Sequence, residues 1–264
     1  MQPPQSHRQT LFHEAMATTF SVEVVHPEPR YARQAVAAVF AELDMLESQL
    51  SRFVEGSDLW RINRLRRGET AVVSLDAFRC LAAALEMHEQ TGGAFDVTYS
   101  SAPTARPAQR LHLAPAGCRV RVLADGVQVD LGGIGKGYSL DRMAALLAEW
   151  DIAAARLAAS TSTILALDPP PDEPGWIVAF GPEGRRVPLR RAAVSASGIA
   201  VKGYHVVDPR TRQPARQHVR AWARAAAATE ADALSTAVLV MTPEQIAQYC
   251  RDWPAEGVVQ DCVG

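Results

Sequence analysis

The sequence predicts an α+β protein, in which strands and helices mix without a regular strand–helix–strand rhythm. Two observations lead to this class. Apolar residues recur at strand spacing in some segments and at helix spacing in others, and no segment is repeated along the chain. The 264 residues are 48% hydrophobic and 21% charged, which is typical of a globular protein. No linker rich in Gly, Ser or Pro divides the chain, so we expect a single domain.

The first half of the chain carries three clear patterns. Residues 18–25 alternate between apolar and polar side chains and predict a half-buried strand. Residues 32–50 and about 75–90 have apolar residues at steps of three and four, which predicts two amphipathic helices, the second ending at Gly92-Gly93. Residues 118–133 predict a β-hairpin with Asp125-Gly126 as its turn.

The second half repeats both kinds of pattern. A helix is expected after residue 138, because its apolar residues keep helical spacing at Leu140, Met143, Leu147 and Trp150. Residues 161–167 and 176–180 predict strands. Helical patterns follow near 229–240 and 243–251, the last opened by Thr242-Pro243.

Charge and cysteine content exclude several classes of protein. The net charge of −2 gives no electrostatic footprint for nucleic acid or an anionic membrane. None of the four cysteines lies in a C-x-x-C spacing, so neither a zinc site nor a redox pair is indicated. No run of about 18 apolar residues predicts a membrane span, and the N-terminal residues lack the features of a signal peptide. We therefore expect a cytoplasmic protein with no nucleic-acid or membrane partner.

A glycine-rich stretch is the most informative local feature. Residues 129–147 read VDLGGIGKGYSLDRMAALL, with Gly132, Gly133, Gly135 and Lys136 directly before a helical pattern. The stretch lacks the spacing of a P-loop and of a dinucleotide-binding fingerprint. Backbone N–H groups at a helix start, with a cation beside them, nevertheless suit a phosphate. The alternative is a tight turn in which Lys136 is merely solvated.

Asp232 and Thr236 form a second candidate site. On a helix, residues four apart lie on one face, so this carboxylate and this hydroxyl point the same way. Two such oxygens, with phosphate oxygens and waters, suit Mg²⁺. The alternative is that Asp232 caps the helix and Thr236 bonds back to a carbonyl one turn earlier.

His205 is a candidate general base, because histidine titrates near neutral pH. The alternative is a histidine satisfied within a strand of the core. Two further polar segments, 51–64 and 91–98, name no chemistry by themselves.

Seven segments, taken in order, carry a resemblance to a known family. They are MATTF (16–20), SRFVEGSDLWRIN (51–63), TGGAFDVT (91–98), VDLGGIGKGYSLDR (129–142), AVSASG (193–198), YHVVDPRTRQPA (204–215) and EADALSTAVLVM (230–241). Together they resemble the ApbE family, the FAD:protein FMN transferases. The resemblance implies one α+β flavin transferase domain over 11–250, with two packed lobes and a cleft between them, and with terminal extensions at 1–10 and 251–264.

The resemblance also implies a reaction and its participants. The family transfers FMN from FAD to a threonine hydroxyl of a target flavoprotein, requires Mg²⁺ and releases AMP. FAD is thus a substrate, and the flavoprotein is the partner. The family is often exported, although this chain shows no signal peptide.

Roles for individual residues follow from the same resemblance. Asp232 and Thr236, with the carbonyl of Gly135, are similar to the family's metal ligands, and His205 with Asp232 would be catalytic. Residues similar to those that hold FAD are Ser51, Asp58, Asp96, Thr98, Gly132, Gly133, Lys136, Ser197 and His205.

Three departures from the family pattern leave two other functions open. Residues 158–163 lack the family's glycine pair, so Ser160, Thr161 and Ser162 would replace its backbone contacts. Arg212 stands where the family has a glycine after Asp208-Pro209, and Val97 replaces a proline. The alternatives are a protein that binds FAD without catalysis and an FAD pyrophosphatase.

Overall fold

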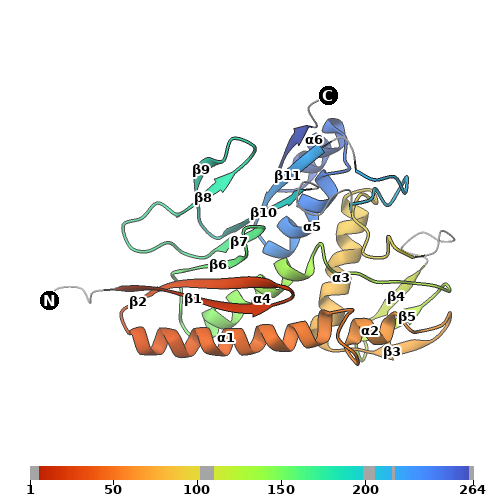
Figure 1. The fold of residues 1–264 in the computed structure, drawn as a ribbon, viewed down its shortest axis with the longest axis horizontal. Coiled ribbons are helices and arrows are strands. Elements are labelled where there is room, and N and C mark those ends of the chain that lie inside the picture. Colours follow the sequence, from red (N-terminus) through yellow and green to blue (C-terminus); the bar gives the residue numbers. More distant parts are fainter. Residues whose placement is uncertain (1–5, 102–109, 199–205, 216–217, 262–264) are drawn as a thin grey trace.

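A seven-stranded antiparallel sheet forms the centre of the molecule in the computed structural model, which describes residues 6–101, 110–198, 206–215 and 218–261 (Figure 1). Its strand order is β1-β2-β6-β7-β10-β11-β12, and every neighbouring pair is antiparallel. The strands are β1 (His7–Ala15), β2 (Thr18–His26), β6 (Ala155–Ala159), β7 (Thr163–Ala166), β10 (Ala192–Gly198), β11 (His218–Ala225) and β12 (Glu256–Asp261). An antiparallel sheet with helices inserted between its strands confirms the predicted α+β class.

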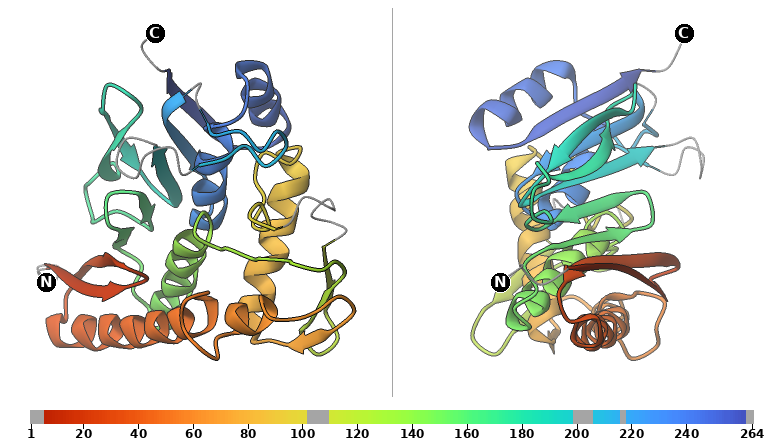
Figure 2. Two further views of the ribbon diagram at one scale, coloured as in Figure 1. Left: turned by 45° about the vertical axis from the view of Figure 1, so that its right-hand side comes forward. Right: turned by 90° about the vertical axis from the view of Figure 1, so that its left-hand side faces the viewer.

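Helices cover one face of this sheet. The helix α1 (Pro29–Leu50) packs on β1 and β2, α4 (Gly135–Glu149) on β6 and β7, and α5 (Ala228–Val238) on β7, β10 and β11 (Figures 1 and 2). The hairpin of β8 (Trp176–Phe180) and β9 (Arg185–Leu189) covers part of the other face with a small apolar cluster. The helices predicted over 32–50, after residue 138 and near 229–240 are confirmed, since they correspond to α1, α4 and α5.

A second, three-stranded sheet lies beside the first, with the order β3-β5-β4. It consists of β3 (Thr70–Val72), β4 (Leu111–Ala114) and β5 (Arg119–Val122). The helices α2 (Asp58–Ile62) and α3 (Leu75–Gln90) share an apolar cluster with this small sheet. The last helix, α6 (Pro243–Asp252), lies directly before β12 in the sequence. The prediction of a hairpin over 118–133 is wrong, because β5 pairs with β3 and β4 and residues 127–130 form no strand. The alternating pattern of 127–131 reflects burial of its apolar residues, not strand pairing.

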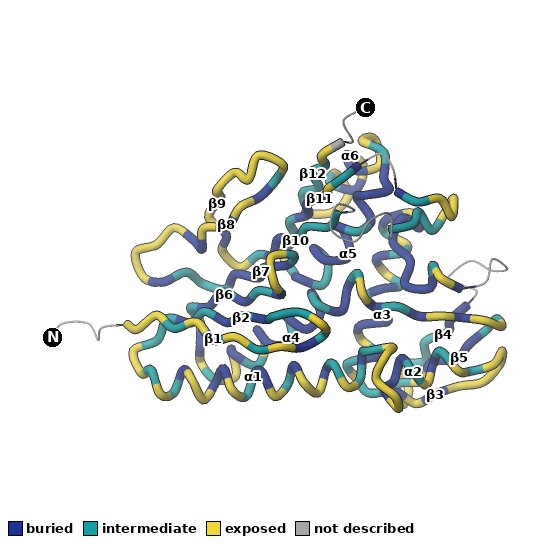
Figure 3. Tube along the Cα trace, in the orientation of Figure 1, coloured by how far each residue is buried: buried dark blue, intermediate teal, exposed yellow. Residues whose placement is uncertain are grey.

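The two largest apolar clusters meet at α4 and α5. One cluster contains the inner faces of β2, α1 and β6, and the other contains α2, α3 and the small sheet. Early residues of α5 belong to the first cluster and later ones to the second, so α5 is buried along most of its length (Figure 3). Both apolar clusters therefore pack against α5 and fix the side chains that it carries.

The sheet reaches beyond residues 11–250 at both ends. β1 begins at His7, and β12 pairs with β11 over residues 256–261. The expected extensions 1–10 and 251–264 thus include edge strands of the sheet. Edge strands with one exposed face carry a weaker apolar signal than central strands, which explains why the sequence did not indicate them.

Candidate functional site

Asp232 lies on α5 as a buried carboxylate, 3% exposed, surrounded by donors from several elements. Its Oδ2 accepts from the backbone N–H of Gly137 at 3.0 Å, and its Oδ1 accepts from Thr163 Oγ1 at 3.2 Å and Ser195 Oγ at 3.3 Å. A buried carboxylate needs such partners because desolvation alone would be costly. The N–H donor is part of the predicted glycine stretch, so the two candidate sites form one.

The hydroxyl of Thr236 lies on the same side of α5. A Cβ added to Gly133 would lie 3.2 Å from Thr236 Oγ1, so the glycine stretch passes directly over this hydroxyl. Ser197 Oγ on β10 is 2.8 Å from Ser235 Oγ and 3.3 Å from Thr236 Oγ1. Thr236 also donates to the carbonyl of Asp232 at 3.4 Å, as the alternative predicted. That bond coexists with the position facing the glycine stretch.

The start of α4 touches α5 through Gly137. A Cβ at this position would lie 2.1 Å from the carbonyl oxygen of Ala228 and 2.8 Å from the Cβ of Asp232. Such contacts are too short for any side chain, so the backbones of the two helices meet here. Glycine at 137 is thus required for the N–H of this residue to reach Asp232.

Lys136 supplies a cation to the same carboxylate. Its Nζ lies 3.3 Å from Oδ2 and 3.4 Å from Oδ1 of Asp232, and 3.2 Å from the carbonyl oxygen of Gly132. The lysine is 24% exposed, and these contacts are long for charged hydrogen bonds. A carboxylate and a carbonyl therefore already face one cationic group, with the hydroxyl of Thr236 nearby.

This donor set fits Mg²⁺ better than a transition metal. All its atoms are oxygens, which Mg²⁺ prefers, and in the part of the chain that the structure describes no three His, Cys, Asp or Glu cluster as metal ligands. The carbonyl of Gly135 accepts from Ser139 Oγ at 2.8 Å, and a carbonyl has a second lone pair. Its predicted role as a third ligand stays a prediction.

Asp96 and Thr98 form a separate buried cluster. Asp96 Oδ1 accepts from the N–H and the hydroxyl of Thr98, both at 2.6 Å, and Arg110 lies 3.3 Å from Oδ2. Burial lowers the pKa of Arg110, and Asp96 opposes this effect. The cluster borders the glycine stretch, because Asp130 N–H donates to the Val97 carbonyl at 2.8 Å. Contact of Asp96 or Thr98 with flavin stays a prediction.

Ser51 and Asp58 hold the segment that joins α1 to α2. Ser51 ends α1, and its carbonyl accepts from Ser57 Oγ at 2.6 Å. Asp58 pairs with Arg61 and accepts from the N–H of Ser74, the cap of α3, at 2.9 Å. Both residues thus have structural partners, and their proposed contact with FAD stays a prediction.

Arg52 connects this segment with the glycine stretch. It lies 3.4 Å from Asp130 Oδ2, while Asp130 Oδ1 accepts from the N–H of Gly132 at 2.9 Å. The segment 51–58 therefore borders the glycine stretch.

Sequence reasoning missed the residues that fix the approach to the glycine stretch. Asn63 pairs with Val129 in both directions, accepting from its N–H at 2.7 Å and donating to its carbonyl at 3.0 Å. Ser101 Oγ accepts from Gln128 N–H at 2.9 Å. Side chains thus replace a neighbouring strand along 128–129. Asn63 is the last residue of the SRFVEGSDLWRIN segment, and its place in that segment is the one sign of its role in the sequence.

The departures from the family pattern have visible consequences. Arg212 adopts φ of +61°, and its N–H donates to the Asp208 carbonyl at 2.7 Å, so the turn closes without the glycine. In the region without a glycine pair, Ser162 Oγ donates to the Ala159 carbonyl. The next hydroxyl, on Thr163, reaches Asp232. His205 lies outside the described residues.

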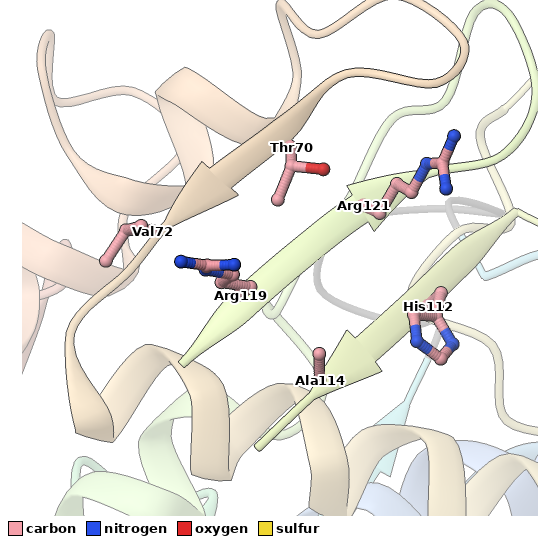
Figure 4. Close-up of a pocket in the computed structure, with 6 residues that line it drawn as sticks. All are labelled: Thr70, Val72, His112, Ala114, Arg119 and Arg121. Atoms are coloured by element: carbon pink, nitrogen blue, oxygen red, sulfur yellow. The ribbon is translucent and has the colours of Figure 1, made fainter. Parts of the chain in front are cut away.

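One surface hollow lies away from these groups. It is lined by residues of β3, β4 and β5 that face away from the core, and none was predicted as a site residue (Figure 4). None of the helices in the described residues combines the length and the apolar content that a membrane span requires.

Comparisons with known proteins give a consistent result. The model of the ApbE family matches residues 16–259. The FAD:protein FMN transferase of Klebsiella pneumoniae (strain 342) is 25% identical over 296 aligned residues, covering 94% of this chain and 83% of that protein. The protein of that name from Salmonella typhimurium is 24% identical, covering 92% and 81%.

Solved structures agree in fold. The flavinyl transferase ApbE of Pseudomonas stutzeri, in its apo form, superposes with a TM-score of 0.83 at 26% identity, covering 98% of this chain and 95% of that one. The flavin transferase ApbE of Vibrio cholerae gives a TM-score of 0.81 at 22% identity, covering 96% and 93%. Since the family model spans nearly the whole chain and takes in both the glycine stretch and α5, this chain belongs to the ApbE family.

Proposed function

We propose that this protein transfers FMN from FAD to a threonine hydroxyl of a target flavoprotein in an Mg²⁺-dependent reaction that releases AMP. Membership of the ApbE family and the names of its relatives support the flavin transfer. The observation that carries the Mg²⁺-dependent step is the convergence of Asp232 and Thr236 with the glycine stretch, which lies about a hundred residues earlier in the sequence.

The glycine stretch would bind the pyrophosphate of FAD. It places Lys136 at the start of α4, where the partial positive charge of the helix end favours an anion. The N–H groups of Gly132 and Gly137 already donate to Asp130 and Asp232, so the ammonium and the helix end are the main attractions for the phosphates. The ammonium of Lys136 contacts Asp232 through long bonds, so it can turn toward a phosphate oxygen at little cost. Neighbouring segments 51–58 and 95–98 would contact the rest of the dinucleotide.

Asp232 and Thr236, with a carbonyl of the glycine stretch, would hold Mg²⁺. Bound there, the metal ion would neutralise negative charge on the phosphates as the bridge between them breaks. The hydroxyls of Thr163 and Ser195 orient the carboxylate by donating to Oδ1. Such partners of a metal ligand contribute to the affinity of the metal site.

The transfer step is a displacement at one phosphorus of FAD. The threonine Oγ of the target attacks the phosphorus of the FMN half, a new P–O bond forms, and the P–O bond to the AMP phosphate breaks. The threonine proton passes to a base, for which we propose His205. AMP leaves with the bridging oxygen. General-base catalysis of this kind contributes roughly 10²–10⁴-fold to a rate.

Incubation with FAD and Mg²⁺, with and without a flavoprotein that carries an acceptor threonine, tests this proposal. We expect AMP and a covalently flavinylated target in equal amounts, and neither product after chelation of the metal. AMP formation without the target would instead indicate an FAD pyrophosphatase. FAD binding with no AMP under any condition would indicate a non-catalytic binding protein.

A further inference from the structure

The N-terminus of α5, the helix that carries Asp232, has no cap of its own. The N-cap residue is Ala227, whose side chain cannot accept a hydrogen bond, and Ala228 is fully buried. The first N–H groups of a helix have no partner within it, and leaving them unpaired in the interior is unfavourable. Another element must therefore provide the acceptor.

Asp141, on α4, provides it. Its Oδ1 accepts from Ala228 N–H at 2.9 Å, and its Oδ2 accepts from the N–H and the hydroxyl of Thr229 at 2.8 and 2.5 Å. Burial raises the pKa of Asp141, and the hydrogen bonds from Thr229 and Ala228 oppose that rise. A carboxylate of one helix thus does the work that an N-cap serine or aspartate does within a helix.

The cap lies one helical turn from the contact between Gly137 and Asp232. Residues 137 and 141 are four apart on α4, and residues 228 and 232 are four apart on α5. The two helices are therefore joined by hydrogen bonds at two levels, with the backbone contact of Gly137 and Ala228 between them. Two levels fix both the sliding and the rotation of α5 against α4.

Small movements of α5 would change the site. Gly133 and Thr236 are already in close contact, and Asp232 accepts from groups on α4, β7 and β10. A shift of a few tenths of an ångström would change several of these distances together. The position of both proposed metal ligands consequently depends on the cap.

We propose that Asp141 is a positioning residue for the metal site, acting through α5 on Asp232 and Thr236. This inference rests on the proposed function. Loss of the cap then weakens Mg²⁺ binding beyond its effect on stability. Groups that hydrogen-bond to a metal ligand typically contribute roughly 10–100-fold to metal affinity, and Asp141, which acts through Ala228 and Thr229, is expected at the lower end of that range.

The test compares Asp141→Ala and the milder Asp141→Asn with Thr242→Ala. Thr242 caps α6, which carries none of the proposed ligands, and its hydroxyl accepts from Gln245 N–H. Mg²⁺ affinity is measured in the presence of FAD from the rise of Tm with MgCl₂ and by calorimetric titration. Neither readout requires turnover.

We expect the dissociation constant for Mg²⁺ to rise about tenfold or more in Asp141→Ala, less in Asp141→Asn, and less than about twofold in Thr242→Ala. Equal changes in the Asp141 and Thr242 variants, or no change in any, would overturn the positioning role while the wild type still binds Mg²⁺. A wild-type protein that binds no Mg²⁺ with FAD would overturn the metal-dependent function itself, and the inference with it.

Discussion

Asp96 and Asp232 are both buried carboxylates, yet their positive partners are held differently. Asp96 faces Arg110, itself buried, and the remaining donors of this cluster come from Thr98, two residues away. Asp232 faces Lys136, which is partly exposed and reaches it through long contacts, while its other donors come from α4, β7 and β10. We therefore expect the cation of Asp96 to be fixed and the cation of Asp232 to be exchangeable.

This difference is the reason that we propose a metal site at Asp232 and a structural role for Asp96. A guanidinium buried among its acceptors cannot leave without exposing the carboxylate to an apolar interior. An ammonium on a flexible stem can move toward solvent or a phosphate and be replaced by a divalent ion. Under the proposed function, charge compensation at Asp232 would thus be shared between the protein and its ligands.

The largest effect on stability is expected at the fixed pair. Arg110→Met removes the partner of Asp96 and leaves a buried charge uncompensated, which typically costs about 3–5 kcal/mol. Urea unfolding measures the loss, and addition of Mg²⁺ should not restore it. Arg190→Met, which removes an exposed partner of Asp168, is the control and should cost less than about 1 kcal/mol. A loss at Arg110 as small as that of the control would contradict the comparison.

The largest effect on activity is expected at the exchangeable site. Asp232→Asn keeps the shape of the side chain but removes its charge, so the proposed Mg²⁺ loses its anionic ligand. Metal stabilisation of a transition state is worth several kcal/mol, so AMP release should fall at least about 100-fold while the fold persists. The rate is measured against Mg²⁺ concentration. An unaltered Mg²⁺ dependence in this variant would exclude Asp232 as a ligand.

Much of the fold around these two carboxylates was predictable, because the helices carry clear periods. The sequence placed α1, α3, α4, α5 and α6 within a few residues. It missed several strands, among them β10 and β11, whose Ala, Ser, Arg and Gly content gives little strand signal, and β12, which has only two β-branched residues between Glu, Gly, Gln and Asp.

The site was predictable in part. Helical spacing put Asp232 and Thr236 on one face, but periodicity cannot indicate a contact with Gly137, 95 residues away. That contact depends on close packing of the α4 and α5 backbones. The feature of the sequence that indicates such packing is Gly137, a glycine within a helix. Asn63 was missed for the same reason, since its partner Val129 is 66 residues away.

Lys136→Met separates the two roles of the lysine. Without the ammonium, Asp232 has no positive partner from the described chain, so the variant should be less stable without metal. Mg²⁺ should then raise its Tm more than it raises that of the wild type, because binding also relieves the uncompensated charge. Its KM for FAD should rise, since the proposed contact of Lys136 with a phosphate of FAD is lost. An equal Mg²⁺-induced shift in both proteins would show that Lys136 does not compensate Asp232.

The smallest effect is expected at Asp168, where the pair is exposed. Hydrogen bonds from Arg191, at 2.8 and 2.7 Å, are the main reason that the pKa of this carboxyl lies below its ordinary value. A lowered pKa in the folded state means that the pair stabilises the protein above the ordinary pKa of an aspartate. That contribution is lost as the pH falls through the lowered pKa.

Asp168→Asn should therefore lower Tm slightly at pH 7, by an amount that shrinks with added salt, and should leave Tm unchanged once the pH is below the lowered pKa of Asp168. The Trp176 indole bonds to the Asp168 carbonyl and is unaffected by the substitution. Arg191→Gln serves as the partner control and should reproduce the same pH profile. A difference in Tm that persists into acid would mean that the side chain acts through packing, because an exposed ion pair can contribute only while its carboxyl is ionised.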